Sequence, residues 1–110
     1  MKISKLKNMV KGWFVGSFTP TAYRTGACEV AVKKYKAGDS EGAHYHKIAT
    51  EVTLVLSGTV ELGGRELNAG DIIALEPGET TGFRAFTNAE TVVVKVPGVL
   101  GDKYVLADSK

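Results

Sequence analysis

The sequence predicts a single all-β domain that closes into a barrel or a sandwich, and three observations carry this prediction. Short runs rich in β-branched and aromatic residues recur along the chain. Turn sequences that contain glycine separate these runs, and no convincing helical segment lies between them. A length of 110 residues suffices for one hydrophobic core with little surplus.

Residues 1–22 are expected to form an N-terminal arm or edge segment, and residues 23–107 the β-barrel. In residues 1–14, apolar side chains recur at near-helical spacing with lysines between them. A basic amphipathic segment of this kind can bind an anionic membrane or an acidic partner. We favour a short helix or edge strand whose apolar side covers the barrel or a neighbouring subunit.

The strands expected from β-propensity follow one another as far as residue 96. They cover residues 23–35, 44–46, 51–57, 59–62, 71–75, 81–86 and 91–96. The strand 51–57 has two different faces, because alternate side chains point the same way. One face begins with Glu51, and the other is wholly aliphatic with Val52, Leu54 and Leu56. If Glu51 faces a ligand cavity, the aliphatic face needs cover from a second sheet or subunit, which favours a homodimer.

Both histidines of the chain lie in one short segment, close to a carboxylate. His44 and His46 are one residue apart, so on a strand their side chains converge on the same side. Residues 47–50 can turn the chain and bring Glu51 to the start of the next strand. Two neutral imidazoles and a carboxylate suit Fe, Mn, Ni, Cu, Co or Zn and leave coordination positions open. We therefore predict one divalent metal ion per chain, although a histidine pair alone also arises by chance.

The spacing around these ligands resembles the first motif of the cupin superfamily. The matching positions are Gly38, His44, His46, Glu51 and Gly58. The resemblance covers about residues 24–97 and implies a small double-stranded β-barrel, or jelly roll, with a metal at its centre. It also implies homodimers as the usual assembly, but it does not fix a reaction.

The second cupin motif is only partly present. Its glycines correspond to Gly70 and Gly78, whereas Thr81 stands where the family has its third metal-binding histidine. Glu79 shares a face with Thr81 in an extended chain and has the longer reach, so it is a candidate further ligand or water-orienting group. A solvated turn after Pro77 is the alternative for Glu79. A degenerate cupin without metal, whose imidazoles hydrogen-bond a ligand, is a further alternative.

Three more residues have the strand parity to line a central pocket, although each also suits plain barrel filling. They are Thr53, Thr81 and Phe83. Lys47 and Arg84 carry charges that could clamp an anionic substrate. Their parity points them away from the metal ligands, so we expect both on a solvated face.

The composition excludes several classes of function. A formal net charge of +2 is too small to argue for a nucleic-acid partner, and no nucleic-acid-binding motif is present. No apolar stretch is long enough for a membrane span or a signal peptide, so no membrane partner is expected. The single cysteine, Cys28, cannot form an internal disulfide and is expected to be a small buried hydrophobe. A reducing, cytoplasmic compartment fits these features.

These features favour a metal-dependent enzyme that acts on a small polar metabolite such as a sugar or a keto acid. The metal ion would polarise a substrate oxygen or activate dioxygen. Oxygenase, isomerase or epimerase, and lyase chemistry are all compatible with the ligand set. The alternative is a non-catalytic cupin module that binds a small ligand or a metal. A purely structural barrel is the least favoured class, since it would have no use for the histidine and glutamate pattern.

Overall fold

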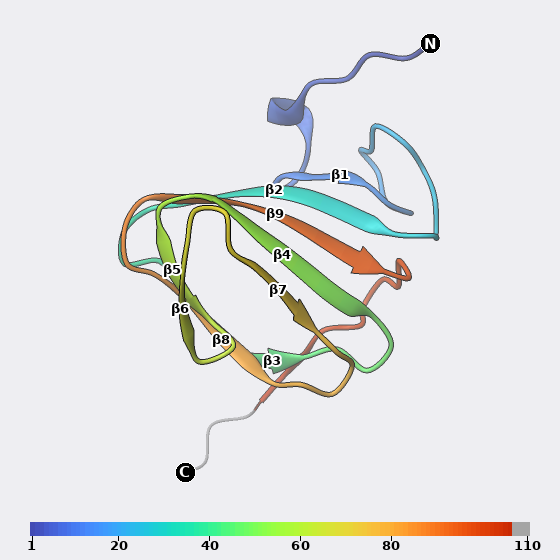
Figure 1. Cartoon of the computed structure of the whole chain (residues 1–110). Coiled ribbons are helices and arrows are strands. Elements are labelled where there is room, and N and C mark those ends of the chain that lie inside the picture. The colour runs from blue at the N-terminus through green and yellow to red at the C-terminus, as the bar shows by residue number, and fades with distance from the viewer. Residues whose placement is uncertain (107–110) are drawn as a thin grey trace.

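The computed structural model describes residues 1–106, which fold into two antiparallel β-sheets that lie face to face (Figure 1). The strand order is β1-β2-β9-β4-β7 in the first sheet and β10-β3-β8-β5-β6 in the second. This arrangement confirms the prediction of an all-β domain of the jelly-roll type. The predicted end of the barrel, residue 107, lies outside the described residues.

Ten strands and one short helix make up the described part of the chain. The first sheet contains β1 (Trp13–Val15), β2 (Glu29–Tyr35), β9 (Ala89–Val96), β4 (Thr50–Ser57) and β7 (Ile72–Leu75). The second contains β10 (Tyr104–Val105), β3 (Ser40–Tyr45), β8 (Thr81–Ala85), β5 (Thr59–Leu62) and β6 (Arg65–Asn68). The 3-10 helix η1 (Leu6–Asn8) precedes β1. Within residues 1–106, no helix has the length and hydropathy of a membrane span.

The first sheet is built around β9, which pairs with β2 on one side and β4 on the other. Side chains alternate between the inside and the outside along each of these strands. On β2 the inward positions are Glu29, Ala31, Lys33 and Tyr35, because Ala31 is fully buried and alternate residues share its face. By the same argument β9 turns Val93 and Lys95 inward. Charged residues thus occupy positions that an ordinary core would fill with apolar ones.

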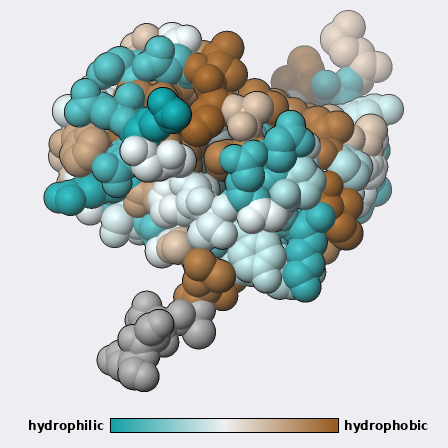
Figure 2. All heavy atoms as spheres, turned by 60° about the horizontal axis from the view of Figure 1, so that its bottom comes forward, coloured by the Kyte–Doolittle hydropathy of each residue, from teal (hydrophilic) through white to brown (hydrophobic). Residues whose placement is uncertain are grey.

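Apolar side chains also reach the outside of the first sheet. The outer face carries the exposed residues Leu56, Ile72 and Val96, whose exposed fractions are 48%, 66% and 49%. Figure 2 shows that hydrophobic residues, in brown, and hydrophilic residues, in teal, are interspersed on the side of the molecule in view. The aliphatic face predicted for the strand 51–57 is therefore partly open to solvent in a single chain.

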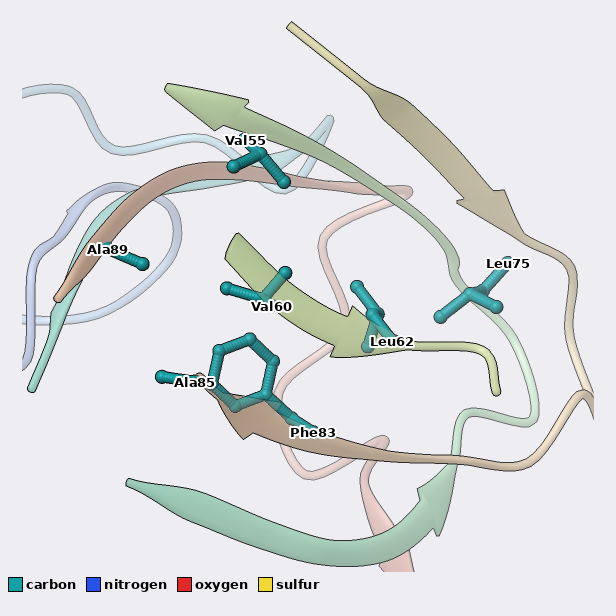
Figure 3. Packing of buried hydrophobic residues seen from close by; sticks show 7 residues of the cluster. All are labelled: Val55, Val60, Leu62, Leu75, Phe83, Ala85 and Ala89. Atoms are coloured by element: carbon teal, nitrogen blue, oxygen red, sulfur yellow. The ribbon is translucent and has the colours of Figure 1, made fainter. Parts of the chain in front are cut away.

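The apolar core lies between the two sheets and extends from the end of the barrel where β4 meets β5 to Leu75, the cross-strand partner of Glu51 (Figure 3). It is formed by Val55, Val60, Leu62, Leu75, Phe83, Ala85 and Ala89. Val55, Val60 and Ala85 are fully buried. The Phe83 ring packs against Tyr35 with the ring centroids 4.2 Å apart. Contacts across both sheets therefore hold this end of the barrel closed.

Several strand limits differ from the prediction. The strand expected over residues 23–35 begins only at Glu29, because a turn closed by the Thr25 hydroxyl and the Ala27 N–H interrupts it. The strand expected over 44–46 begins earlier, at Ser40, and stops just before His46. Strand β6 was not predicted at all. It forms a hairpin with β5 across Gly63 and Gly64, whose φ angles of 64° and 71° suit glycine.

Candidate metal centre

The three predicted metal ligands come together at the end of the barrel where β3 ends and β4 begins, which we call the polar end. His44 lies on β3, His46 follows the end of that strand, and Glu51 is the second residue of β4. One ligand atom from each side chain lies within 4.8 Å of the other two. Both histidines are buried, with exposed fractions of 6% and 5%. The expected convergence on a single point is therefore present in the structure.

The two imidazole rings are oriented by main-chain carbonyl groups. The Nδ1 atom of His46 lies 2.6 Å from the Asp102 carbonyl oxygen, and that of His44 lies 3.2 Å from the Gly42 carbonyl oxygen. A carbonyl oxygen can only accept a hydrogen bond, so each Nδ1–H must donate. In a neutral ring the other nitrogen, Nε2, then carries a lone pair. Both histidines thus have the tautomer that a metal ligand needs.

The facing atoms of His46 and Glu51 need a cation between them. Nε2 of His46 is buried without a hydrogen-bond partner among the described residues, 3.5 Å from Oε1 of Glu51. A neutral imidazole lone pair and a carboxylate oxygen are both acceptors, so they repel unless a proton or a metal ion binds them. Two such imidazoles and one carboxylate are a donor set that first-row transition metals favour. The residues present therefore fit a divalent metal ion.

The contact between His46 and Glu51 also shifts the pKa of each group. Contact with Glu51 raises the pKa of His46, burial opposes that rise, and the Asp102 carbonyl adds to it. Burial alone would raise the pKa of Glu51, but the contact with His46 and the charge of Lys95 lower it below 4.5. Both shifts favour the imidazolium and the carboxylate as a pair, and metal binding would displace a proton held there.

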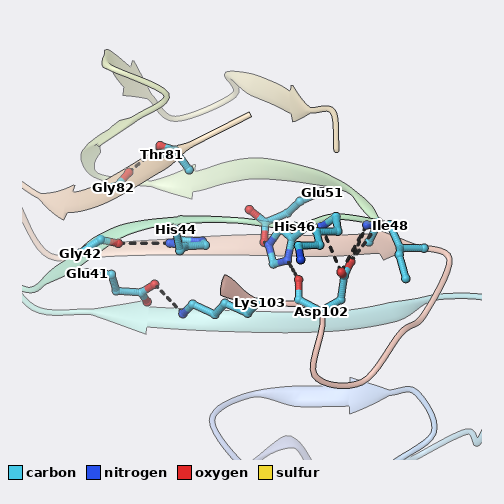
Figure 4. A network of polar contacts seen from close by, with 12 residues as sticks. Glu41, Gly42, His44, His46, Ile48, Glu51, Thr81, Gly82, Asp102 and Lys103 are labelled. Atoms are coloured by element: carbon cyan, nitrogen blue, oxygen red, sulfur yellow. Dashed lines mark hydrogen bonds and ion pairs between the residues drawn. The ribbon is translucent and has the colours of Figure 1, made fainter. Parts of the chain in front are cut away.

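Asp102 holds the loop between β3 and β4 in place (Figure 4). Its buried carboxylate accepts hydrogen bonds from the backbone N–H groups of Lys47, Ile48 and Ala49 at 3.0, 3.0 and 2.8 Å. Burial alone would raise the pKa of Asp102, but these three donors outweigh it and lower the pKa below 3.8. Because its carbonyl also orients His46, this one residue positions both the ligand and the turn that leads to Glu51.

A cavity of about 410 Å³ adjoins the three ligands. Thr53 and Phe83 line it, at the positions that strand parity predicts. Thr81 does not line it. Its hydroxyl accepts a hydrogen bond from the Gly63 N–H and donates one to the Gly82 carbonyl oxygen, both at 2.7 Å. Thr81, which stands at the position of the third histidine in the cupin motif, therefore stabilises the β5–β6 turn.

The side chains of the remaining candidates do not line the cavity. Glu79 is exposed, and its Oε1 accepts a hydrogen bond from the Glu76 N–H at 3.0 Å in the turn before β8. This arrangement corresponds to the solvated turn that was the alternative for Glu79. Lys47 and Arg84 are also exposed and lie over the rings of Tyr104 and Phe86. Neither lines the cavity, as their parity predicted.

Sequence reasoning missed the lysines of the cavity. Lys11, Lys33, Lys95 and Lys103 all line it. The signal that could have found two of them is strand alternation: Lys33 shares its face with Ala31, and Lys95 shares its face with Val93. In the strand predicted over 91–96, the valines on both sides of Lys95 obscure this alternation. Asp102 was missed because no spacing rule links it to His46, 56 residues away.

Solved structures share this fold. An uncharacterized conserved protein with a double-stranded beta-helix domain from Klebsiella pneumoniae has a TM-score of 0.69 and 26% identity, over 76% of this chain and 74% of that one. A cupin-2 domain-containing protein from Shewanella frigidimarina has a TM-score of 0.57 and 18% identity, over 66% and 72%. No protein-family profile and no curated protein sequence matches the chain.

A longer protein contains the same fold. An oxalate decarboxylase from Bacillus subtilis has a TM-score of 0.64 and 19% identity, over 74% of this chain but only 24% of that one. Two facing sheets around a histidine and glutamate cluster define a double-stranded β-helix with a candidate metal site. The chain has the double-stranded β-helix fold of small cupin domains, as the spacing of its first motif predicted.

Proposed function

We propose that this protein is a mononuclear metalloenzyme that acts on a small polar metabolite. The observation that supports it best is the convergence of His44, His46 and Glu51 on one side of a cavity of about 410 Å³. A volume near the lower end of the usual range for ligand sites suits a metabolite of modest size. Similarity to an oxalate decarboxylase whose Mn(II) centres are known supports metal-dependent chemistry within this fold.

Each part of the site has a separate task in this proposal. A bound divalent metal would act as a Lewis acid on a substrate oxygen. His44 and His46 would hold the metal through Nε2, since each Nδ1–H is engaged with a carbonyl group. Glu51 would supply the anionic ligand, because a carboxylate paired with a cation is a poor general base. Phe83 and Val93, which come from different sheets, would exclude water from the parts of the cavity that they line.

Elemental analysis by plasma mass spectrometry tests the metal site after reconstitution with individual divalent metals. We expect about one metal per chain in the wild type, and loss of the metal in His44→Ala and Glu51→Ala. Glu79→Ala is the matched control, because this carboxylate lies in the exposed turn and should leave the metal content unchanged. If the wild type takes up no metal under any loading, the metalloenzyme proposal is wrong and a ligand-binding barrel replaces it.

Turnover separates an enzyme from a binding module. The metal-loaded protein is incubated with sugars, keto acids and hydroxy acids, with and without dioxygen. Conversion that is lost in Glu51→Ala supports the enzyme. Tight binding without any conversion supports the non-catalytic module instead.

We also propose that the protein forms a homodimer through the outer face of the first sheet. Leu56, Ile72 and Val96 are exposed there, next to the half-buried residues Val52 and Val94. Burial of this face in a second copy would remove its apolar area from water. Light scattering should give twice the chain mass for the wild type and a smaller mass for Ile72→Lys. A wild-type monomer at micromolar concentration would contradict the dimer.

A further inference from the structure

Two lysines occupy inward positions beside the candidate metal centre. Lys33 on β2 and Lys95 on β9 are both half-buried and line the cavity. Lysine is among the residues least often placed inside a protein, because burial disfavours its charge. Apolar packing therefore does not explain why lysines occupy these two positions.

Both ammonium groups lie against the same aromatic ring. The Nζ atom of Lys33 is 5.1 Å from the centre of the Trp13 ring, and that of Lys95 is 4.9 Å from it. Trp13 comes from the edge strand β1, which pairs with β2. Lys33 also donates a hydrogen bond to the Lys11 carbonyl oxygen at 2.9 Å. These contacts hold the two positive charges at one wall of the cavity.

Neither charge has an anionic partner in the described part of the chain. No carboxylate oxygen of residues 1–106 forms an ion pair with Lys33 or Lys95. Glu41 pairs instead with Lys103 at 3.6 Å. Burial lowers the pKa of Lys33, and the charges of Lys11, Lys103 and Lys95 lower it further against the opposing effect of Glu41. The lysines thus repel one another, and Glu41 and Glu51 attract them only from beyond ion-pair distance.

The cavity as a whole carries an excess of positive charge. Its lining contains four lysines and three glutamates, a net charge of +1 with neutral histidines. A divalent metal at His44, His46 and Glu51 raises this to +3. A neutral polyol would leave the excess in place, whereas an organic acid would reduce it.

We propose that the cavity binds a small hydroxylated carboxylic acid, whose carboxylate lies between the ammonium groups of Lys33 and Lys95 and whose hydroxyl oxygens face the metal ligands. This inference rests on the proposed function for the metal end of the site. The lysine end stands on its own geometry and binds a carboxylate with or without the metal. Charge-assisted hydrogen bonds to the two ammonium groups are the source of affinity.

The fluorescence of Trp13 reports ligand binding near the two lysines, because Trp13 is the single tryptophan of the chain. Its fluorescence is followed while gluconate or tartrate is added to metal-free and zinc-loaded protein. Glucitol and threitol, which carry a CH₂OH group in place of each carboxylate, are the matched neutral probes. We expect each acid to bind at least about tenfold more tightly than its polyol, which corresponds to one charge-assisted hydrogen bond. Added sodium chloride should weaken binding of the acid and leave the polyol unaffected.

Substitution to methionine removes each charge and keeps most of the apolar stem that packs on Trp13. Lys33→Met and Lys95→Met should each weaken acid binding about tenfold or more, with polyol binding unchanged. Lys34→Met is the matched control, because Lys34 is the next residue on β2 and points outward to Glu90 at 3.9 Å. It should bind the acids as the wild type does.

Equal affinity for acids and polyols in the wild type would overturn the proposal. So would unchanged acid binding in both lysine variants, or no saturable response to either acid at millimolar concentration. The salt dependence of the wild type decides the matter if a variant fails to fold. Metal content, measured separately, distinguishes the two proposals: a protein without metal that still selects acids through Lys33 and Lys95 refutes only the metalloenzyme.

Discussion

The two ends of the barrel interior differ in polarity and in packing although the same strands build them. At one end, Val55, Val60, Ala85 and Ala89 are buried at 3% exposure or less and form a closed apolar core. At the other end, the inward positions hold histidines, glutamates and lysines around a cavity. Strand β4 passes from one environment to the other, since Glu51 and Val55 lie on the same face. Strand β4 thus contributes Val55 to the stabilising core and Glu51 to the candidate metal centre.

Buried polar atoms without a hydrogen-bond partner are concentrated in the cavity lining. Within residues 1–106, the buried side-chain atoms without a hydrogen-bond partner are Oε2 of Glu29, Nε2 of His46 and Oγ1 of Thr91. All three residues line the cavity. Such atoms cost stability unless water, an ion or a ligand satisfies them, so their concentration in the cavity lining marks this part of the interior as the polar one. The apolar end must therefore offset the stability that the unsatisfied polar groups of the cavity cost the domain.

A charge at the apolar end is the most severe way to break this division. Val60→Asp would place a carboxylate at a fully buried position with no cationic partner in the core cluster. We expect a loss of several kcal/mol, enough to unfold the domain at 25 °C. Urea denaturation followed by circular dichroism measures the change. Glu61→Ala on the exposed side of the same strand is the control and should alter stability by less than about 0.5 kcal/mol. A Val60→Asp protein with wild-type stability would contradict the assignment of this end as the stabilising core.

Asp102 tests how far the polar end contributes to its own stability. Asp102→Asn replaces a carboxylate that accepts three backbone hydrogen bonds by an amide that clashes with some of those donors. We expect a loss of about 2–3 kcal/mol at pH 7 and a metal affinity lowered about 10- to 100-fold. Denaturation and metal titration measure the two effects.

The same variant has a predictable dependence on pH. The pKa of Asp102 is lower in the folded protein than its usual 3.8, so the charged form stabilises the fold. This contribution is present above about pH 4 and is lost as the pH falls through the folded pKa. The stability gap between wild type and Asp102→Asn should therefore narrow in acid. A gap that is constant from pH 7 to pH 3 would contradict a role for the carboxylate charge.

Tyr35 lies at the border between the two ends and gives the smallest effect. It packs on Phe83 and also lines the cavity. Burial raises its pKa well above 10, with further contributions from Glu41, Glu51 and Asp39. The neutral phenol is thus favoured in the folded state, and its stabilising contribution is complete below pH 10 and declines above it. Tyr35→Phe should match the wild type within about 1 kcal/mol at pH 7 and lose less stability between pH 10 and pH 12. Parallel alkaline curves for the two proteins would show that Tyr35 is not buried in this way.

The sequence predicted what local periodicity and short spacing can carry. The convergence of His44, His46 and Glu51 follows from strand alternation and one short turn. The all-β class follows from repeated β-branched runs between glycine turns. The inward position of Lys95 was accessible by the same alternation, but the valines around it gave both faces of the strand an apolar character.

Other features depend on contacts between distant segments. Asp102 reaches His46 and the 47–49 loop through backbone atoms, which leave no side-chain pattern in the sequence. The place of Trp13 in the cavity wall follows from the pairing of β1 with β2, and edge pairing is not encoded by the spacing of residues along either strand. Strand β6 contains the charged residues Arg65 and Glu66, so its β-propensity is too low to predict a strand from the sequence.

The anchoring of both imidazoles to main-chain carbonyl groups has a consequence for how such a protein can change. Gly42 and Asp102 fix the rings through atoms that every amino acid possesses, so ring orientation does not depend on the cavity-facing side chains of β2 and β9. New side chains at 33 and 95 could therefore alter which molecule is admitted while leaving the ion-binding geometry untouched. A barrel organised in this way could change the ligand that it admits by single substitutions, without rebuilding the histidine and glutamate cluster.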